Sequence, residues 1–477
     1  MFNPSDRWRV VGAICLCFFA RGLFYACATP LWEGFDEHGS VAALEAVASG
    51  AALPPAHPPI SREIESSLRL APLPRGFVGF VPAAISHDEF WGLSESARER
   101  RAAALRDLPT AWRSEPGGIP PVYSTRRGPL YYWLLRPFYE LAGSMSLLNR
   151  VFLLRVANVL MATLAIPLGY LLARSVLENH AAGLCAAAAL AAMPEVAMNV
   201  AHVGPEPVSL LLGTALALAA LRVEETVHAV WCGLLLGFAL LAEPHFVVVP
   251  AVFVMALGLA RRWKLALVTV GIAGLLAGWW YAFDWAQPAA KTTMGVFGAI
   301  GKVEWIRAAD FTWNTLVWSG NGSFLGLRSW VYRLMLLMLL AAVFGLSRTG
   351  RRWKPPVWIL VGFHVAVMAA LAWEGLEDVR TGGLAVTPGW YLCCLAAAGA
   401  CLAVYGFRGV LPGSIAIPAF AFGSLDLYGL HVVLMPYYAG LITYSATGRL
   451  AAFPPRTCYG RRQAWSKGPR IRWRRPW

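Results

Sequence analysis

Charged side chains are scarce in this chain: of its 477 residues only 14% are Asp, Glu, Lys or Arg, whereas 57% are hydrophobic. About a quarter of an ordinary soluble domain is charged, so the composition excludes that class. Apolar runs of roughly 20 residues recur along most of the length, and such a run spans the bilayer core. The sequence therefore predicts an all-α integral membrane protein.

The nine cysteines form no pattern typical of a disulfide framework or a zinc site. None lies in the long polar stretch from Pro30 to Asn149, and no two are spaced as Cys-x-x-Cys. The sequence also lacks a Walker loop, a Rossmann fingerprint, a His-Glu-x-x-His motif and a nucleophile elbow. We therefore predict neither a bound metal nor a resident cofactor. A divalent ion stays an alternative that no residue pattern supports.

Acidic residues are outnumbered by basic ones, 27 to 41, which gives a formal net charge of +14. The basic surplus lies in short loops between apolar runs and in the segment from Arg449 to Trp477. Lys and Arg gather on the cytoplasmic side of membrane proteins, close to anionic lipid. This distribution favours contact with the lipid bilayer, and we predict no nucleic-acid partner.

The first apolar run extends from Val10 to Ala28 and follows Arg7 and Arg9. Its end, Ala26-Cys27-Ala28, is similar to a signal cleavage site, but an uncleaved helix with a cytosolic N-terminus is simpler because many spans follow. With that helix we predict about twelve transmembrane helices, the others at 150–173, 181–200, 206–221, 228–242, 246–260, 264–284, 328–346, 356–373, 384–406, 410–429 and 431–448.

Four regions follow from this assignment. Residues 1–29 hold the N-terminus and the first transmembrane helix, and 30–149 form a large extracytoplasmic loop. The helix bundle occupies 150–448, with a second external loop at about 285–327. Residues 449–477 form a basic tail, and the alternation of spans places both termini in the cytosol. In the large loop we expect a surface helix at 36–49, a charged helix at 89–108 and an interfacial helix at 130–143.

Ionisable residues gather at the predicted outer ends of the spans, beginning with Asp36, Glu37 and His38 just beyond the first helix. Such a group can take up a proton or bind a cation, but it can equally anchor a helix end in water. Glu243 and His245 stand in a turn that interrupts a long apolar run. Irregular backbone at membrane depth is tolerated where it lines protein or a wet cavity. This one-sided clustering predicts a site at the outer membrane surface.

Several motifs follow one another in a recognisable order. Asp36-Glu37 comes early in the large loop, Arg127-Gly128-Pro129-Leu130-Tyr131-Tyr132-Trp133-Leu134 comes late in it, and Leu154-Arg155-Val156-Ala157-Asn158 follows. Glu206 stands at the next external turn, before a glycine- and leucine-rich segment at 233–241. In this order the motifs resemble the polytopic GT-C glycosyltransferases, such as protein O-mannosyltransferases and lipid A aminoarabinose transferases. The sequence departs from their pattern at three positions, with Gly128 for Pro, Glu243 for Lys and Trp390 for Arg.

The resemblance implies an inverting transferase at the extracytoplasmic face of a bacterial inner (plasma) membrane. Its donor would be a polyprenyl-phosphate sugar, and its acceptor a glycan, a lipid or a protein. Asp36 would act as the base, and Glu37 would orient or bind the acceptor. The remaining candidate residues would bind substrate or donor: His38, Arg126, Arg127, Tyr131, Glu206, Glu243, His245 and Arg380. A lipid-linked sugar transporter and a non-catalytic membrane assembly protein are the alternatives.

Overall fold

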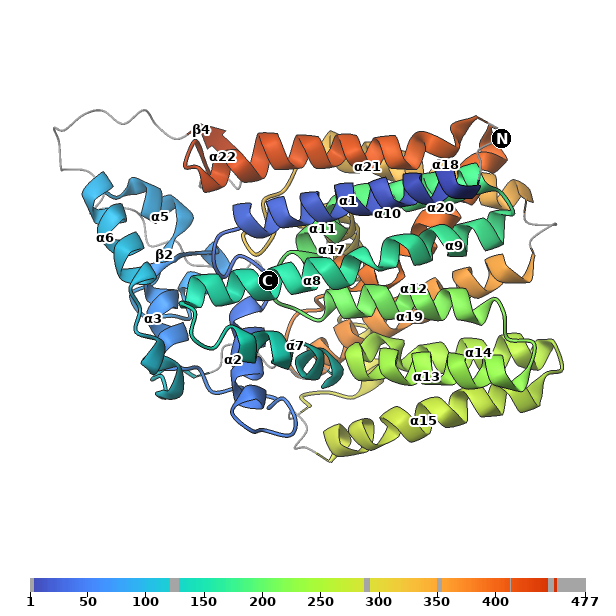
Figure 1. Cartoon of the computed structure of the whole chain (residues 1–477), viewed down its shortest axis with the longest axis horizontal. Helices are drawn as coiled ribbons and strands as arrows, with labels where there is room; N and C mark the ends of the chain where they lie inside the picture. Colours follow the sequence, from blue (N-terminus) through green and yellow to red (C-terminus); the bar gives the residue numbers. More distant parts are fainter. Residues whose placement is uncertain are drawn as a thin grey trace.

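The computed structural model describes residues 4–120, 128–286, 292–349, 354–411, 413–444 and 450–452. Long helices lie side by side in a bundle, and the short elements of the large loop gather at one end of it (Figure 1). The first helix, α1 (Pro4–Ala28), begins at the opposite end. We name the end with the large loop the outer end, and the end where α1 begins the inner end.

The bundle is built from apolar helices whose sequences follow the predicted spans. In chain order after α1 they are α8 (Leu147–Thr163), α9 (Ala165–Leu177), α10 (His180–Ala192), α11 (Pro194–Val200), α12 (Glu206–Ala220), α13 (Thr226–Ala242), α14 (Val249–Leu259), α15 (Trp263–Trp285), α18 (Ser329–Thr349), α19 (Pro355–Arg380), α20 (Ala396–Val410) and α21 (Ile417–Tyr428). Buried Leu, Val and Ala residues from most of them form one continuous core.

Within the described residues, seven helices are long and apolar enough to cross a membrane, or eight if the pair α10 and α11, bent by 56°, counts as one. Three shorter apolar helices accompany them: Glu206–Ala220, Thr226–Ala242 and Pro244–Leu259. These helices agree with an integral membrane protein, because each long one exceeds the length that the bilayer core requires.

The last two predicted spans, 410–429 and 431–448, are a single helical segment from Ser414 to Tyr438. A π-helical turn, η6 (Gly429–Leu434), joins α21 directly to α22 (Met435–Tyr438). Gly429 is a packing residue here, since a Cβ on it would lie 2.3 Å from the Trp318 ring. The predicted boundary between two spans at residue 430 is therefore wrong.

This correction changes the side on which the chain emerges. After α22 the strand β3 (Ile442–Tyr444) lies at the outer end, where Thr443 donates a hydrogen bond to Asp88 of the large loop (2.6 Å). The predicted return of the chain to the inner end before residue 449 is therefore wrong. The basic tail predicted at 449–477 lies outside the described residues, apart from the short strand β4 (Leu450–Ala452).

The large loop folds into short helices: α2 (Glu37–Ala48), α3 (Arg62–Leu70), α4 (Arg75–Val78), α5 (His87–Gly92), α6 (Glu95–Arg106), a 3₁₀ turn η1 (Thr110–Ser114) and α7 (Leu130–Leu141). The helix predicted at 89–108 is divided into α5 and α6 because Ser86 and Ser94 each cap a helix N-terminus. The 12 residues of α7 are too few to span a membrane.

Two small sheets also correct the all-α prediction. Strands β1 (Pro72–Leu73) and β2 (Ile85–Ser86) pair in parallel within the large loop, and β3 pairs with β4 in antiparallel fashion. Each sheet has only two short strands. The sheets therefore join neighbouring loop segments by hydrogen bonds and do not form a separate layer of the fold.

A buried ion pair ties the first helix to the last. Arg21 of α1 donates two hydrogen bonds to the carboxylate of Asp426 in α21, at 2.8 and 2.6 Å, and Tyr25 donates a third at 2.7 Å. Arg21 also donates to the carbonyl oxygen of Met193, at the bend between α10 and α11 (3.1 Å). An arginine inside a membrane helix is costly unless it is paired. Arg21 is therefore paired by Asp426 of α21 and by the chain at the bend between α10 and α11.

Candidate functional site

The turn between α1 and α2 holds Asp36 in an unusual backbone conformation. Asp36 has a φ of 51°, in the left-handed region, and its carbonyl oxygen accepts the amide of Ser40 as α2 begins (2.9 Å). Aspartate tolerates this region better than most residues with a side chain. Within the described chain the Asp36 carboxylate does not cap α2, and the residue is half-buried. The backbone therefore sets the position of the carboxylate, and the carboxylate does not serve as the N-cap of α2.

Glu37, the next residue, is fully buried and fixed. Arg155 of α8 donates to both of its carboxylate oxygens, at 2.8 and 2.6 Å, and the amides of Val203 and Trp32 donate at 3.0 and 3.2 Å. Burial alone would raise the pKa of Glu37, but the charge and hydrogen bonds of Arg155 lower it below its ordinary value. The charged form of Glu37 is thus favoured, and Glu37 and Arg155 together form a buried clamp.

Arg155 completes this clamp from the other side. Its guanidinium also donates to the carbonyl oxygens of Ala26, Thr29 and Pro30, at 3.0, 2.6 and 3.0 Å. These carbonyls end α1, so one arginine joins the first helix, the Asp36 turn and α8. A guanidinium suits this task because it carries five donors in a rigid plane.

Glu206 and Tyr131 lie in a buried polar layer beside the clamp. The imidazole Nε2 of His202 lies 3.6 Å from a carboxylate oxygen of Glu206. Burial lowers the pKa of His202, but Glu206 and Glu37 together raise it above its ordinary value. Asn158 donates to the carbonyl oxygen of His202 (2.6 Å) and to the hydroxyl of Tyr131 (3.1 Å). The layer therefore fixes the turn between α11 and α12 next to Glu37.

An aromatic cluster flanks Asp36 on its N-terminal side. The ring of Phe35 stacks on Trp390 with 3.9 Å between centroids. Phe324 and Phe311 lie against the same tryptophan, at 6.1 and 6.3 Å. Trp390 belongs to a 3₁₀ turn, η4 (Gly389–Leu395), that precedes α20. At the position where the resembled family has a cation, this chain therefore has an aromatic wall.

The broken helix after α13 forms a second polar cluster. His245, in the 3₁₀ turn η2 (Pro244–Val248), contacts Glu243 through Nδ1 at 2.5 Å and Glu374 of α19 through Nε2 at 2.7 Å. Its ring also lies 4.5 Å from that of Tyr391. Both imidazole nitrogens face carboxylates, so each donates a proton and the ring carries a positive charge. An imidazolium thus stands two residues after Glu243, the position at which the resembled family has a lysine.

Four predicted residues lie elsewhere or cannot be placed. His38 is buried against Phe77, with 4.5 Å between ring centroids, and burial lowers its pKa to about 4. Arg380 pairs with Glu377 at 2.5 Å, and its carbonyl accepts from Thr293. Among the described contacts, none joins Arg380 to Asp36 or Glu206. Arg126 and Arg127 lie outside the described residues.

Glu33 was not predicted, although it lies three residues before Asp36. Its buried carboxylate contacts Nε2 of His87 in α5 at 2.8 Å and accepts from the backbone amide of Ser323 and the hydroxyl of Tyr438, both at 3.2 Å. Its carbonyl oxygen accepts from Gly322 (2.8 Å). Glu33 therefore fastens the start of the large loop to the second external loop and to α22. Only its position beside the Asp-Glu pair could have indicated this role.

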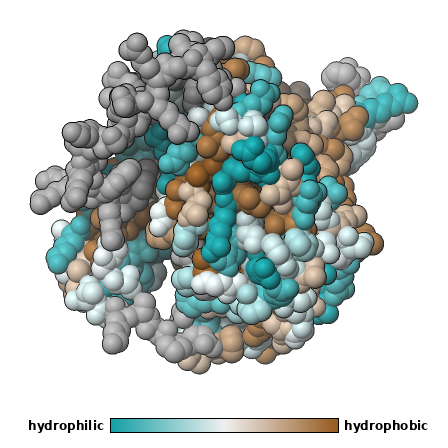
Figure 2. Space-filling model, turned by 90° about the vertical axis from the view of Figure 1, so that its left-hand side faces the viewer, coloured by the Kyte–Doolittle hydropathy of each residue, from teal (hydrophilic) through white to brown (hydrophobic). Residues whose placement is uncertain are grey.

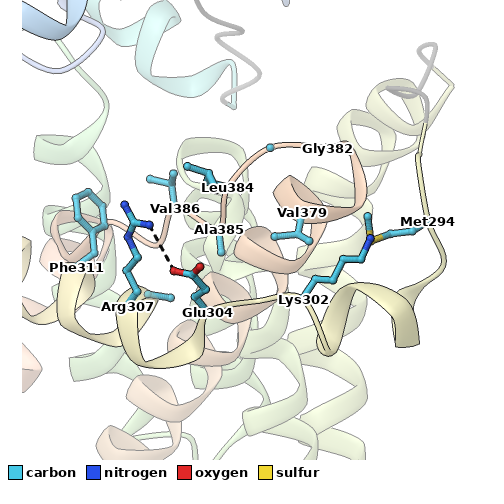
Figure 3. Close-up of a pocket in the computed structure, with 12 residues that line it drawn as sticks. Met294, Lys302, Glu304, Arg307, Phe311, Val379, Gly382, Leu384, Ala385 and Val386 are labelled. Carbon is cyan, nitrogen blue, oxygen red and sulfur yellow. Dashed lines mark hydrogen bonds and ion pairs between the residues drawn. The ribbon is translucent and has the colours of Figure 1, made fainter. Parts of the chain in front are cut away.

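A cavity of about 270 Å³ opens between α17 (Trp305–Val317) and the segment that follows α19 (Figure 3). Lys302 and Arg307 carry positive charges at it, and Arg307 pairs with Glu304 at 3.4 Å. Leu384 is among its apolar lining residues, and Phe311 belongs both to it and to the aromatic cluster. The cavity is therefore amphipathic and lies next to the wall that flanks Asp36.

The surface of the outer end is mixed in character. Figure 2 faces this end and shows hydrophilic residues across much of it, with hydrophobic residues exposed between them. Within the described residues no three His, Cys, Asp or Glu side chains are grouped closely enough to hold a metal ion.

Comparison with known proteins identifies similar folds only among solved structures. No protein-family model matches this chain, and no curated protein matches it. The oligosaccharyltransferase of Archaeoglobus fulgidus in its apo form is 10% identical over 92% of this chain and 56% of that chain, with a TM-score of 0.47. ArnT from Cupriavidus metallidurans, bound to undecaprenyl phosphate, is 16% identical over 64% of this chain and 69% of that chain, with a TM-score of 0.29.

Both are GT-C glycosyltransferases. Another structure of the archaeal enzyme, AglB in complex with an inhibitory peptide and a dolichol-phosphate, is 13% identical over 64% of this chain and 48% of that chain, at a TM-score of 0.37. This chain spans about half the length of the archaeal enzyme, 44% and 56% in two structures. At these identities and TM-scores the similarity does not bear on activity.

Proposed function

We propose that this chain is a membrane glycosyltransferase that moves a sugar from a polyprenyl-phosphate donor to an acceptor at the outer end. The contrast between two adjacent acids carries the proposal. Glu37 is fully buried in its clamp with Arg155, whereas Asp36 is half-buried and held by a left-handed backbone. A half-buried carboxylate at the outer end can meet a substrate, whereas the fully buried carboxylate of Glu37 cannot.

Asp36 would act as the general base. It would accept the proton of the acceptor group as that group attacks the sugar carbon. The bond from this carbon to the phosphate oxygen breaks, and the polyprenyl phosphate leaves with the electron pair. A single displacement of this kind inverts the sugar carbon. A positioned base accelerates such a step by about 10²–10⁴-fold. Glu37 would contribute by fixing the position of Asp36, which refines its predicted role as an orienting residue.

The departing phosphate needs positive charge, which is usually the largest contribution to such catalysis. We assign this role to Arg127, with Arg126 beside it, because guanidinium groups bind phosphate through paired donors. Gly128, the next residue, packs so closely on α13 that a Cβ would lie 1.8 Å from the carbonyl oxygen of Leu241. Gly128 therefore lies against the end of α13, where Glu243 and His245 follow.

The other candidate residues would surround the sugar and the lipid phosphate. Glu206, with His202, would line the site next to Glu37. His245, charged between Glu243 and Glu374, would supply a cation near the donor phosphate. The amphipathic cavity at Lys302 and Phe311 would admit an acceptor with both charged and apolar parts.

The test is transfer by the purified full chain in liposomes, supplied with a panel of polyprenyl-phosphate sugars and candidate acceptors. Asp36→Asn should lower turnover by about 10²–10⁴-fold while the melting temperature stays unchanged. Asp310→Asn is the matched control, since Asp310 is also at the outer end but exposed in α17. Normal turnover by Asp36→Asn would refute the base assignment.

The same assay separates the two alternatives. A transporter would move the lipid-linked sugar across the bilayer in the absence of any acceptor, and it would not form a new glycosidic bond. A non-catalytic assembly protein would show no turnover with any donor, and cells would tolerate Asp36→Asn without a defect.

A further inference from the structure

A second polar cavity lies at the inner end, remote from Asp36. Its volume is about 410 Å³, and it is formed by the end of α9, the start of α10 and the residues that follow α12. The polar residues that line it are Arg174, Ser175, Glu178, Asn179, His180 and Arg222. The proposed transferase reaction uses none of them, so this cavity requires its own explanation.

The charges in this cavity do not balance. Glu178 is the one acid in its lining, and that carboxylate already pairs with Lys354 at 2.6 Å. The guanidinium groups of Arg174 and Arg222 therefore face the cavity without a lining acid to neutralise them. Glu224 and Glu225 follow Arg222 in the chain but do not line the cavity. The lining is thus suited to an anion.

His180 adds to this positive character without carrying charge itself. Its Nε2 contacts the guanidinium of Arg7 from α1, and its Nδ1 lies 2.9 Å from the hydroxyl of Tyr170. A guanidinium can only donate, so Nε2 must accept and the imidazole is neutral. The histidine thereby holds Arg7 at the same cavity, which brings a third arginine to it.

The cavity lies at the depth of lipid headgroups. Trp8 of α1, whose ring packs edge-on against Tyr170 at 5.6 Å, is exposed, and so are Trp231 and Trp263 at the same end. Exposed tryptophans mark the membrane interface. Leu171 gives the cavity an apolar wall beside its arginines. The lining therefore combines a site for a charged headgroup with apolar surface.

We propose that this inner cavity binds the phosphodiester headgroup of an anionic phospholipid, with Arg174 and Arg222 donating to the phosphate. Arginine forks match phosphate oxygens in pairs, and basic pockets between membrane helices on the cytoplasmic side bind anionic headgroups. A free phosphate offers the same oxygens but no acyl chain, so the apolar wall favours the lipid. This proposal does not depend on the transferase activity.

The test measures lipid binding to the detergent-purified full chain by native mass spectrometry. Dioleoyl phosphatidylglycerol should bind in preference to dioleoyl phosphatidylcholine. The double variant Arg174→Gln/Arg222→Gln should bind phosphatidylglycerol about 30-fold more weakly, because each cation near a membrane surface contributes about fivefold. The matched control is Lys264→Gln/Arg348→Gln, which removes two cations from the same end outside the cavity and should leave the affinity unchanged.

Three results would overturn the proposal. Equal binding of the two lipids by the unmodified chain would exclude a headgroup site, and this result does not require any variant to fold. Equal weakening by the control pair would show general attraction to a basic face. Displacement of phosphatidylglycerol by excess inorganic phosphate would identify an anion site without lipid specificity. Retained binding by Arg174→Lys/Arg222→Lys, with loss in the Gln pair, would support the charge-based mechanism.

Discussion

The two ends of the molecule use charged residues in opposite ways. The outer end has exposed ion pairs, such as Arg62 with Glu115, but it also has acids and bases in buried pairs. Glu37 with Arg155 and Glu63 with Arg150 are such pairs, and their side chains are almost inaccessible to solvent. At the inner end the charged side chains are exposed, and Lys354 and Glu178 pair across the surface. Buried pairs hold a structure in one arrangement, whereas exposed charges remain available to water and lipid. The comparison indicates that buried pairs at the outer end fix the positions of its side chains. At the inner end the exposed charges are instead accessible to water and lipid.

The largest effect should follow from opening the buried clamp. Glu37→Gln would leave the Arg155 charge buried without its partner, and breaking a buried pair in this way costs about 3–5 kcal/mol. We expect a large fall in the melting temperature in detergent, together with reduced yield of folded protein. Asp36→Asn, one residue away, should change the melting temperature little because Asp36 is half-buried. Equal destabilisation by the two variants would remove the distinction between a clamp and a base.

The next largest effect tests whether a pair within the membrane behaves like the clamp. Asp426→Asn keeps the shape of the side chain but removes the charge that faces Arg21 and Tyr25. Hydrogen bonds to charged groups contribute about 1.5–3 kcal/mol, so we expect a loss of about that size in the free energy of unfolding. Denaturant titration in detergent would measure it, and the paired variant Arg21→Met/Asp426→Leu should recover part of the loss. A neutral result for Asp426→Asn would mean that helix packing alone joins α1 to α21.

Titration of His38 provides a third, smaller test at the outer end. Burial lowers the pKa of His38 to about 4, so the stability contributed by its neutral form is present above about pH 6.5 and is lost as the pH falls toward 4. Burial raises the pKa of Glu45, in the same helix, to about 7, and protonation of this acid favours the fold as the pH falls. The two trends oppose each other in the unmodified chain.

Replacing His38 should leave the trend of Glu45, in which the free energy of unfolding rises as the pH falls. Relative to the unmodified chain, His38→Gln should gain about 2 kcal/mol in unfolding free energy between pH 7 and pH 5. Melting curves at both pH values measure this difference, and Glu45→Gln should shift it in the opposite direction. If the difference between His38→Gln and the unmodified chain stays constant with pH, the histidine does not titrate in this range.

The sequence was sufficient to predict the membrane class and to single out Asp36 and Glu37 as neighbouring acids just beyond the first helix, because these depend on local composition and order. It could not separate the roles of the two acids. The partner of Glu37 is Arg155, 118 residues later, and only the packing of α1 against α8 brings them together. Arg155 and Asn158 were present in a motif, but their contacts were not apparent from that motif.

The errors of the sequence-based prediction have an equally physical origin. The lengths of the apolar runs predicted a boundary between two spans at residue 430. In the structure Gly429 permits close packing on Trp318, and a π-helical turn continues the helix. Glu33 was missed because its partners, His87, Ser323 and Tyr438, come from three distant parts of the chain. Neither long-range packing nor a long-range hydrogen bond has a local sequence pattern.

The smallest effect should come from the inner end, where Lys354 and Glu178 form an exposed pair at 2.6 Å. Lys354→Ala removes the pair, but exposed ion pairs contribute little because water and salt already screen the charges. We expect the melting temperature to change by no more than about 1 °C, against the large fall for Glu37→Gln. The same variant should leave Glu178 as an unneutralised acid in the inner cavity, so phosphatidylglycerol binding should weaken while stability does not. A large loss of stability would show that the inner end, too, depends on fixed pairs, and the contrast between the two ends would fail.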